Sequence, residues 1–257
     1  MAIVLFILGR PGSGKSTAAR HIVDQVRLHY NDWSTVRIND YDILYEMSRV
    51  DKRFSSTAYD GYDGFDVLDH SAFDDALCRL KNRIAKEIKS NAKRKLIIIE
   101  FARDDYSKTL KRFFPELLRN AYFLFIDTSI PICKQRIHER VSKPLAERIA
   151  EDDRFVSPFI FETYYRRDNQ RYFSSVAIQL EKESHVSESH VGVIEDNNLT
   201  LVDFKDQVES LVGRILQMET KVQPKLIRQI VRSQLYKQSH NKTRVSLRSL
   251  LLNYLLF

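Results

Sequence analysis

The sequence predicts an α/β fold in which a five-stranded parallel sheet lies between two layers of helices. Short apolar runs alternate with segments of helical periodicity along the chain, and this order is typical of parallel sheets with right-handed crossovers. The clearest runs are continuously apolar, as in strands buried on both faces. All but the first end at or just before a carboxylate. Ligands of such sheets bind beyond the carboxyl ends of the strands, so the site is expected there.

We expect the five strands at residues 3–8, 34–38, 95–100, 121–127 and 191–194, the last being the weakest pattern. Helical spacing of apolar residues predicts helices over 17–28, 73–88, 132–141 and 201–218. The tyrosine- and aspartate-rich segment 41–72 indicates an irregular, substrate-facing insertion. Residues 180–190, rich in Ser, Glu and His, indicate an exposed loop.

A phosphate-binding loop follows the first predicted strand. It consists of Gly9, Arg10, Pro11, Gly12, Ser13, Gly14, Lys15 and Ser16, with Thr17 continuing into the helix. Glycines let the backbone turn inward, so that successive N–H groups and the helix N-terminus face an anion. In this pattern Lys15 reaches the β- and γ-phosphates and Ser16 binds Mg²⁺. The alternative is a glycine-rich turn that binds nothing. That alternative does not explain why every position fits the motif while an apolar strand precedes it and a helix follows it.

Length and composition bound the remaining possibilities. A chain of 257 residues can form one α/β core with room for an insertion. The two cysteines, Cys78 and Cys133, indicate a reducing compartment rather than a disulfide scaffold, so we expect a cytoplasmic protein. The apolar start of the chain lacks a basic region and runs into the loop, which is unlike a signal peptide. No apolar run approaches the ~18 residues of a membrane span.

The net charge of +7 comes from the end of the chain. Residues 221–257 carry eight Lys or Arg and no Asp or Glu, which leaves 33 basic and 34 acidic residues before them. We therefore expect one α/β domain over 1–220 and a basic C-terminal extension over 221–257. A basic amphipathic helix can bind nucleic acid or acidic lipid, but we favour an appendage that is loosely ordered or packs on a partner.

With these segments placed, residues 1–220 resemble the P-loop nucleotide and small-molecule kinases, of which adenylate kinase is the familiar member. The resemblance implies the strand order 2-3-1-4-5 and a helical lid over residues 136–168. Arg136 and Arg140 look like the family's R-x-x-x-R at the entry to the lid, where the first stacks on adenine and the second meets phosphate. Arg166 is similar to an arginine at the lid's exit, and Asn197 to a residue that contacts adenine.

Two further segments resemble other kinases. The tetrapeptide Glu100-Phe101-Ala102-Arg103 looks like the Glu-Arg pair of deoxyribonucleoside kinases, in which the carboxylate accepts the proton of the substrate hydroxyl. Residues 39–42 are similar to the segment with an aspartate after the second strand of polynucleotide kinases and zeta-toxin-type sugar kinases. The acceptor is accordingly left open between these classes.

Asp40 and Glu100 are the candidate bases, because both end strands beside the loop. We expect Glu100 to lie nearer the Mg²⁺ held by Ser16, and Asp40 nearer the acceptor hydroxyl. The alternative for each is a helix cap or a solvated acidic end. The candidate cations for phosphate oxygens are Arg103, Arg136, Arg140 and Arg166, against the alternative of ordinary surface arginines.

These patterns predict an ATP- and Mg²⁺-dependent kinase acting on a small acceptor, with a nucleoside or nucleotide as first choice. A polynucleotide 5′-end or a sugar is the alternative acceptor. A regulatory ATPase, whose output is a conformation and not a phosphorylated product, is the competing class. The lid-like arginines favour the kinase, because a switch has no need to close over a second substrate.

Overall fold

The computed structural model describes residues 2–59, 62–90, 94–147, 155–165 and 172–217. The chain divides into two compact units, Met1–Val212 and Gly213–Phe257. Both sheets lie in the first unit. The predicted basic extension over 221–257 lies outside the described residues.

The main sheet contains β1 (Ala2–Leu8), β2 (Ser34–Asn39), β5 (Lys95–Phe101), β6 (Tyr122–Asp127) and β7 (Val191–Glu195). All neighbouring pairs are parallel, in the order β2-β5-β1-β6-β7. Counted along the chain, these five strands have the order 2-3-1-4-5. Two more strands, β3 and β4, form a separate hairpin and take the intervening numbers. The predicted α/β class and the predicted order of the sheet strands are confirmed.

Strand register fixes which residues meet at the carboxyl edge of this sheet. Every residue of β5 and β6 is buried, as their continuous apolar sequences predict. Glu100, near the end of β5, lies opposite Ile7 of β1 on one side and Asn39 of β2 on the other. The register therefore brings the phosphate loop, Glu100 and the start of the segment after β2 to one place.

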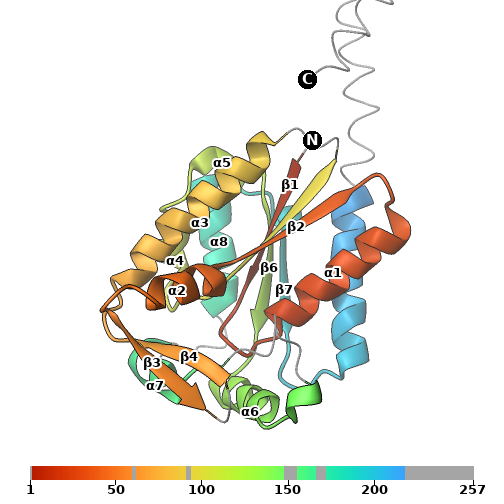
Figure 1. Cartoon of the computed structure of the whole chain (residues 1–257). Coiled ribbons are helices and arrows are strands. Elements are labelled where there is room, and N and C mark those ends of the chain that lie inside the picture. Colours follow the sequence, from red (N-terminus) through yellow and green to blue (C-terminus); the bar gives the residue numbers. More distant parts are fainter. Residues whose placement is uncertain (1, 60–61, 91–93, 148–154, 166–171, 218–257) are drawn as a thin grey trace, which may run out of the picture. The chain divides into compact units, whose positions relative to one another are not determined.

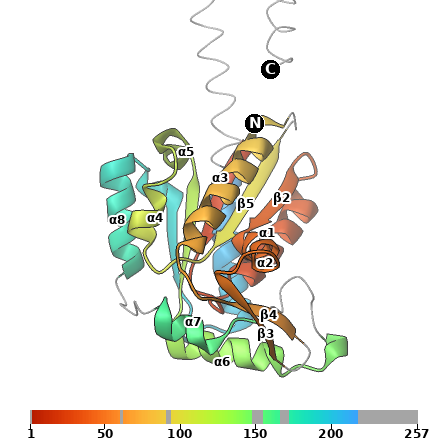
Figure 2. The same ribbon diagram turned by 60° about the vertical axis from the view of Figure 1, so that its left-hand side comes forward.

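Helices cover both faces of the sheet (Figures 1 and 2). On one face lie α1 (Lys15–His29) and the helix that begins at residue 201, drawn in blue. On the other face lie α3 (Ala72–Lys89), α4 (Tyr106–Leu110), α5 (Pro115–Arg119) and α8 (Tyr172–Ser184). None of the described helices combines the length and the apolar character needed to cross a bilayer.

A group of shorter elements lies beyond the carboxyl ends of the strands, at the bottom of Figure 1. They are β3 (Phe54–Tyr59), β4 (Tyr62–Val67), α6 (Ile130–Val141), the 3₁₀ turn Leu145–Glu147 and α7 (Pro158–Thr163). α2 (Asp40–Ser48) follows β2 and lies above the hairpin, beside α3. A second 3₁₀ turn, Glu188–His190, precedes β7. These elements enclose the region where the register places Glu100.

The expectation of an irregular segment over 41–72 was wrong, because the segment forms α2 and the antiparallel hairpin β3–β4. Asn39 caps α2: its side chain accepts a hydrogen bond from the Tyr41 N–H at 2.9 Å. In the hairpin Phe54 lies opposite Val67, and both are buried. The many Tyr and Asp residues of the segment obscured this pattern, since they are divided between α2, the hairpin and the turns beside them.

The expected exposed loop over 180–190 was also wrong in its first half, where α8 continues to Ser184. Phe173, Val176 and Leu180 are buried on one face of that helix, at the spacing that an amphipathic helix requires. The Ser and Glu residues of this helix occupy its other positions. Composition therefore misled the prediction, whereas periodicity would have found the helix.

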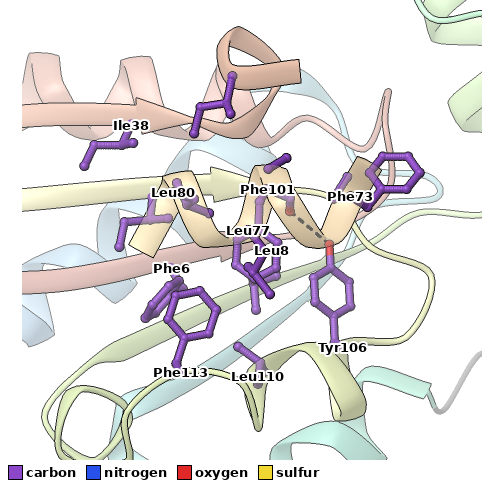
Figure 3. Packing of buried hydrophobic residues seen from close by; sticks show 14 of the residues in the cluster. Phe6, Leu8, Ile38, Phe73, Leu77, Leu80, Phe101, Tyr106, Leu110 and Phe113 are labelled. Atoms are coloured by element: carbon purple, nitrogen blue, oxygen red, sulfur yellow. Dashed lines mark hydrogen bonds between the residues drawn. The ribbon is translucent and has the colours of Figure 1, made fainter. Parts of the chain in front are cut away.

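The core between the sheet and the α3–α4 layer is rich in aromatic rings (Figure 3). The fully buried Phe6 of β1 stacks on Phe123 with ring centroids 5.2 Å apart. Its ring also meets Phe113 and Phe101 edge-on, at 5.3 and 6.1 Å. These contacts join β1, β5, β6 and the turn after α4, so the central strand is held from several sides.

The substitution Phe6→Ala should lower the free energy of unfolding by about 3–5 kcal/mol, because it leaves a cavity among three rings. Urea denaturation followed by circular dichroism measures this loss. Leu28→Ala is the matched control: Leu28 is 68% exposed on α1, and its loss should cost no more than about 0.5 kcal/mol. Equal losses for the two variants would contradict the placement of Phe6.

Candidate active site

The phosphate loop turns sharply between β1 and α1. Gly12 and Gly14 have φ values of +81° and +98°, which only glycine adopts without strain. A Cβ on Gly12 would also lie 2.5 Å from the carbonyl oxygen of Cys133 in α6. The turn is closed by a hydrogen bond from the Ser13 N–H to the Arg10 carbonyl, 3.1 Å long. The two glycines are therefore required by backbone conformation and, at Gly12, by close packing.

Lys15, the first residue of α1, reaches back over the loop. Its Nζ donates to the carbonyls of Gly9 and Arg10 at 2.8 and 2.7 Å. Burial lowers the pKa of Lys15 from its ordinary 10.5 to about 8, although the negative charges of Asp40 and Glu100 act in the opposite direction. The ammonium is thus charged at neutral pH and close to losing that charge in mild alkali.

Glu100 is fully buried and has a partner at each carboxylate oxygen. Ser16 Oγ donates to Oε2 at 2.9 Å. Arg37 donates to Oε1 through Nε at 3.0 Å and through a terminal nitrogen at 2.9 Å. A hydroxyl and a carboxylate in contact are the oxygen ligands that Mg²⁺ takes in phosphate sites, so Ser16 and Glu100 fit such an ion. Among the described residues there is no cluster of three or more His, Cys, Asp or Glu side chains that could hold a metal without other ligands.

Asp40 begins α2 and forms a buried ion pair with Arg103, the two side chains being 7% and 3% exposed. Burial raises the pKa of the Asp40 carboxyl, and the positive charge of Arg103 opposes this. Arg103 also donates to the carbonyls of Ala102 and Phe73 at 2.6 and 3.1 Å. Its guanidinium is therefore fixed by three partners.

The structure adds the partners of these charged groups. Sequence analysis grouped Glu100 and Arg103 in one motif and named Arg103 as a candidate cation for phosphate. In the structure Arg103 is paired with Asp40, and Glu100 is paired with Arg37. Asp40 is not a helix cap, because Asn39 fills that position.

Two cavities meet at the loop. We call the first the basic cavity; it is lined by Gly12, Gly14, Lys15, Ser16, Thr17, Arg20, Arg136, Glu139, Arg140, Lys143, Asp196, Leu199, Thr200, Leu201 and Phe204. We call the second the aromatic cavity; its walls include Pro11, Asp40, Tyr41, Leu44, Phe65, Phe73, Phe155, Ile160 and Tyr165. Gly12, Lys15, Ser16 and Arg140 line both cavities. Lys15 and Ser16 therefore stand where the contents of the two cavities could meet.

The predicted arginines of α6 line the basic cavity, whereas two other predicted residues are not placed in it. Arg136 forms an ion pair with Asp196 and donates to its two carboxylate oxygens at 2.6 and 3.2 Å. Arg140 lines both cavities. Asn197 is exposed and accepts a hydrogen bond from the Ser129 N–H at 2.9 Å, away from the cavity lining. Arg166 lies outside the described residues.

Three functional side chains were missed by sequence reasoning. Arg37 is the only charged residue inside β2, and that isolated charge in a β-branched run was a usable signal. The Tyr106 hydroxyl accepts from the Gly9 N–H at 2.8 Å and lies 3.0 Å from the Phe101 carbonyl (Figure 3). Arg10 donates to the Thr128 carbonyl at 2.9 Å, beneath the loop. The contacts of Tyr106 with Gly9 and of Arg10 with Thr128 join residues about a hundred positions apart. No local sequence pattern predicts them.

Comparison with known proteins gives matches in structure alone. No family model matches the chain, and no curated protein matches it by sequence. Kti12 of Chaetomium thermophilum, solved with ADP-AlF3, is 13% identical and matches with a TM-score of 0.51 over 83% of this chain and 97% of its own. The chain shares the three-layer α/β fold of that protein.

Two solved kinases are similar at lower TM-scores. The APS kinase of Mycobacterium tuberculosis, in complex with AMPPNP and APS, is 13% identical, with a TM-score of 0.47 over 82% of this chain and 98% of its own. Shikimate kinase from Acinetobacter baumannii, in complex with shikimate, is 11% identical, with a TM-score of 0.41 over 84% and 94%.

Binding of a nucleoside triphosphate at the loop should weaken as pH rises through about 8, because Lys15 then loses the charge that attracts phosphate. Above that pH the affinity should fall by up to about tenfold per pH unit, until the bound ligand itself keeps Lys15 charged. Titration with a fluorescent ATP analogue measures the effect.

Lys15→Met is the control for this pH dependence. It should bind weakly throughout and should show no change across the same range. An affinity for the unmodified protein that stays constant from about pH 7 to about pH 9.5 would contradict the lowered pKa of Lys15.

Proposed function

We propose that the protein is an ATP- and Mg²⁺-dependent kinase that transfers the γ-phosphoryl group to a small acceptor. The observation that carries this proposal is the pair of cavities that share Gly12, Lys15, Ser16 and Arg140. A phosphotransferase needs a donor site and an acceptor site that open on the same phosphoryl position. An ATPase that works only as a switch has no use for the second of these.

The basic cavity is the proposed ATP site. The loop backbone and the start of α1 would cradle the phosphates. Lys15 would leave the carbonyls of Gly9 and Arg10 and reach the β- and γ-phosphates, and Arg140 would add a second cation. Arg136 donates a hydrogen bond to Asp196, and both residues line this cavity. The resemblance assigns Arg136 to stacking on the adenine. Mg²⁺ would be held by Ser16 and Glu100 and would supply positive charge to the transferring phosphoryl group.

The aromatic cavity is the proposed acceptor site, with Asp40 as the base. An acceptor hydroxyl beside Asp40 would attack the γ-phosphorus, forming an O–P bond while the bond to the β–γ bridging oxygen breaks and ADP leaves. The hydroxyl proton would pass to the Asp40 carboxylate. Burial raises the pKa of Asp40, which brings it closer to the range useful for a base, and Arg103 fixes its position.

The proposal also covers the insertion, the lid, the cellular compartment and the C-terminal extension. The hairpin supplies Phe65 and Val67 to the aromatic cavity, which supports a substrate-facing role for residues 41–72. α6 supplies Arg136 and Arg140 to the basic cavity, which supports the start of the proposed lid over 136–168; residues 148–154 and 166–168 of that range lie outside the described residues. Both cysteines are free thiols, as expected for a cytoplasmic protein. Nucleic acid binding by residues 221–257 is not part of this proposal.

Purified protein should consume ATP faster in the presence of an acceptor and should transfer labelled γ-phosphate to it. Nucleosides, nucleotides, oligonucleotide 5′-ends and sugars form the panel, and thin-layer chromatography detects the product. Lys15→Ala should abolish both ATP binding and transfer. ATP hydrolysis that no acceptor stimulates would favour the regulatory ATPase, and turnover retained by Lys15→Ala would refute the loop's role.

The two carboxylates should be distinguishable by substitution. Asp40→Asn should lower turnover by about 10²- to 10⁴-fold with ATP affinity little changed, when assayed well below the pKa of Lys15. Glu100→Gln should in addition raise the Mg²⁺ concentration required for half-maximal rate, because it removes a proposed ligand. Asp42→Asn, on the same helix but outside the cavity lining, should match the unmodified protein. An unchanged Mg²⁺ requirement in Glu100→Gln would contradict its assignment.

A further inference from the structure

The aromatic cavity is charged at one end and apolar along its walls. Lys15, Asp40 and Arg140 are the charged residues that line it within the described part of the chain. The apolar walls come from several elements and include Tyr41, Leu44, Phe65, Phe73, Phe155 and Ile160. A ligand that fills this cavity must therefore present a polar group at one end and apolar or aromatic surface elsewhere.

Several polar groups along the walls already have partners within the chain. The hydroxyl of Tyr41 donates to the Phe155 carbonyl at 3.3 Å, and that of Tyr165 donates to the Ala102 carbonyl at 3.2 Å. The Ser157 hydroxyl accepts from the Phe159 N–H at 3.2 Å. A molecule with hydroxyls around its whole edge, such as a free sugar, would have to desolvate them against these walls with few new hydrogen bonds in return, which is costly.

The cations of the cavity stand at the end that it shares with the basic cavity. Lys15 and Arg140 line both cavities and are close enough for the charge of Arg140 to lower the pKa of Lys15. Both are needed there for the phosphates of the donor. The other arginine nearby, Arg103, lies behind the wall, 5.1 Å from the ring of Phe73 and paired with Asp40. An acceptor with its own phosphate or carboxylate would compete with ATP for the same two cations.

The aromatic walls are firmly built. The ring of Phe155 lies on the backbone of Gly64, where a Cβ would come within 2.6 Å of its Cδ1. Phe65 packs between Tyr41 and Phe54, with ring centroids 5.3 and 5.5 Å away. Rings held in this way form a fixed slot rather than a surface that rearranges around any ligand.

We propose that the acceptor is an uncharged hydroxyl compound with an aromatic or apolar body, such as a nucleoside or an aromatic alcohol. This inference rests on the proposed kinase function and narrows its acceptor. The hydroxyl lies at the Lys15 and Asp40 end, and the body lies between Phe65, Phe155 and the residues of α2. Phosphorylated, carboxylated and polyhydroxylated acceptors are disfavoured by the walls and by competition for Lys15 and Arg140.

Binding of matched probes tests the inference without requiring catalysis. Adenosine is compared with adenosine monophosphate, benzyl alcohol with benzoate, and both neutral probes with glucose, by ligand-observed NMR in the presence of a non-hydrolysable ATP analogue and Mg²⁺. We expect at least one neutral aromatic probe to bind about tenfold or more tightly than its charged counterpart and than glucose. Tighter binding of a charged probe or of glucose, or no binding of either neutral probe, would overturn the inference.

Substitution of Phe65 locates the binding. Phe65→Ala should weaken the neutral probe by about tenfold or more while ATP affinity is unchanged. Phe65→Leu, which keeps an apolar side chain and the fold, should give a smaller loss. Leu68→Ala is the matched control, because Leu68 follows the same hairpin strand but is 59% exposed and outside the cavity lining. Probe binding that Phe65→Ala and Phe65→Leu both leave unchanged would contradict the site.

Phosphate transfer from labelled ATP to the same probes is measured separately. Selective binding of a neutral probe without any transfer would refute the kinase function and leave the acceptor-site chemistry intact. Efficient transfer to a charged or sugar acceptor, in preference to the neutral ones, would confirm the kinase and refute the inference.

Discussion

Two carboxylates buried at the carboxyl edge of the sheet determine how the rest of the site is built. Asp40 follows β2 and is paired with Arg103, which follows β5. Glu100 lies in β5 and is paired with Arg37, which lies in β2. Both ion pairs therefore join the β2 side of the site to the β5 side. The acid comes from the β2 side in the first pair and from the β5 side in the second. A carboxylate buried without a partner costs several kcal/mol, so each arginine must be in place for its own acid to stay charged there.

Lys15 depends on these acids as much as on the loop. Burial removes water from its ammonium and lowers its pKa, and the charges of Asp40 and Glu100 recover part of the loss. A loop with the same sequence on a sheet without the two acids would hold a lysine that is easily deprotonated and binds phosphate weakly. The phosphate-binding motif is thus local in sequence, whereas its electrostatic state is set by β2 and β5, far away along the chain.

The difference between a local motif and its distant electrostatic partners explains how much could be predicted from the sequence. The strands of the sheet and the loop were predicted because apolar runs, helical periodicity and a short glycine motif are local signals. The order of the strands came from the resemblance to P-loop kinases and not from these signals. The strand ends drew attention to Asp40 and Glu100, which the structure places at the carboxyl edge of the sheet. Their ion pairs with Arg103 and Arg37 were not predicted, because neighbours in a parallel sheet are separated by a crossover helix and depend on register. The hairpin β3–β4 and the helix α8 were missed where polar composition was given more weight than alternation or periodicity.

The aromatic walls bear on the chemistry as well as on the choice of acceptor. Water is the commonest competing nucleophile at an activated γ-phosphoryl group, and a kinase must keep it out. Phe65, Phe155 and Asp40 line the same cavity, so under the proposed function an acceptor that fills it would displace water from beside Asp40, the proposed base. An empty slot would leave the base with water alone, held less precisely than a docked hydroxyl. The packing of Phe155 on Gly64 is therefore more than a structural detail, since it supports the wall on which this selection depends.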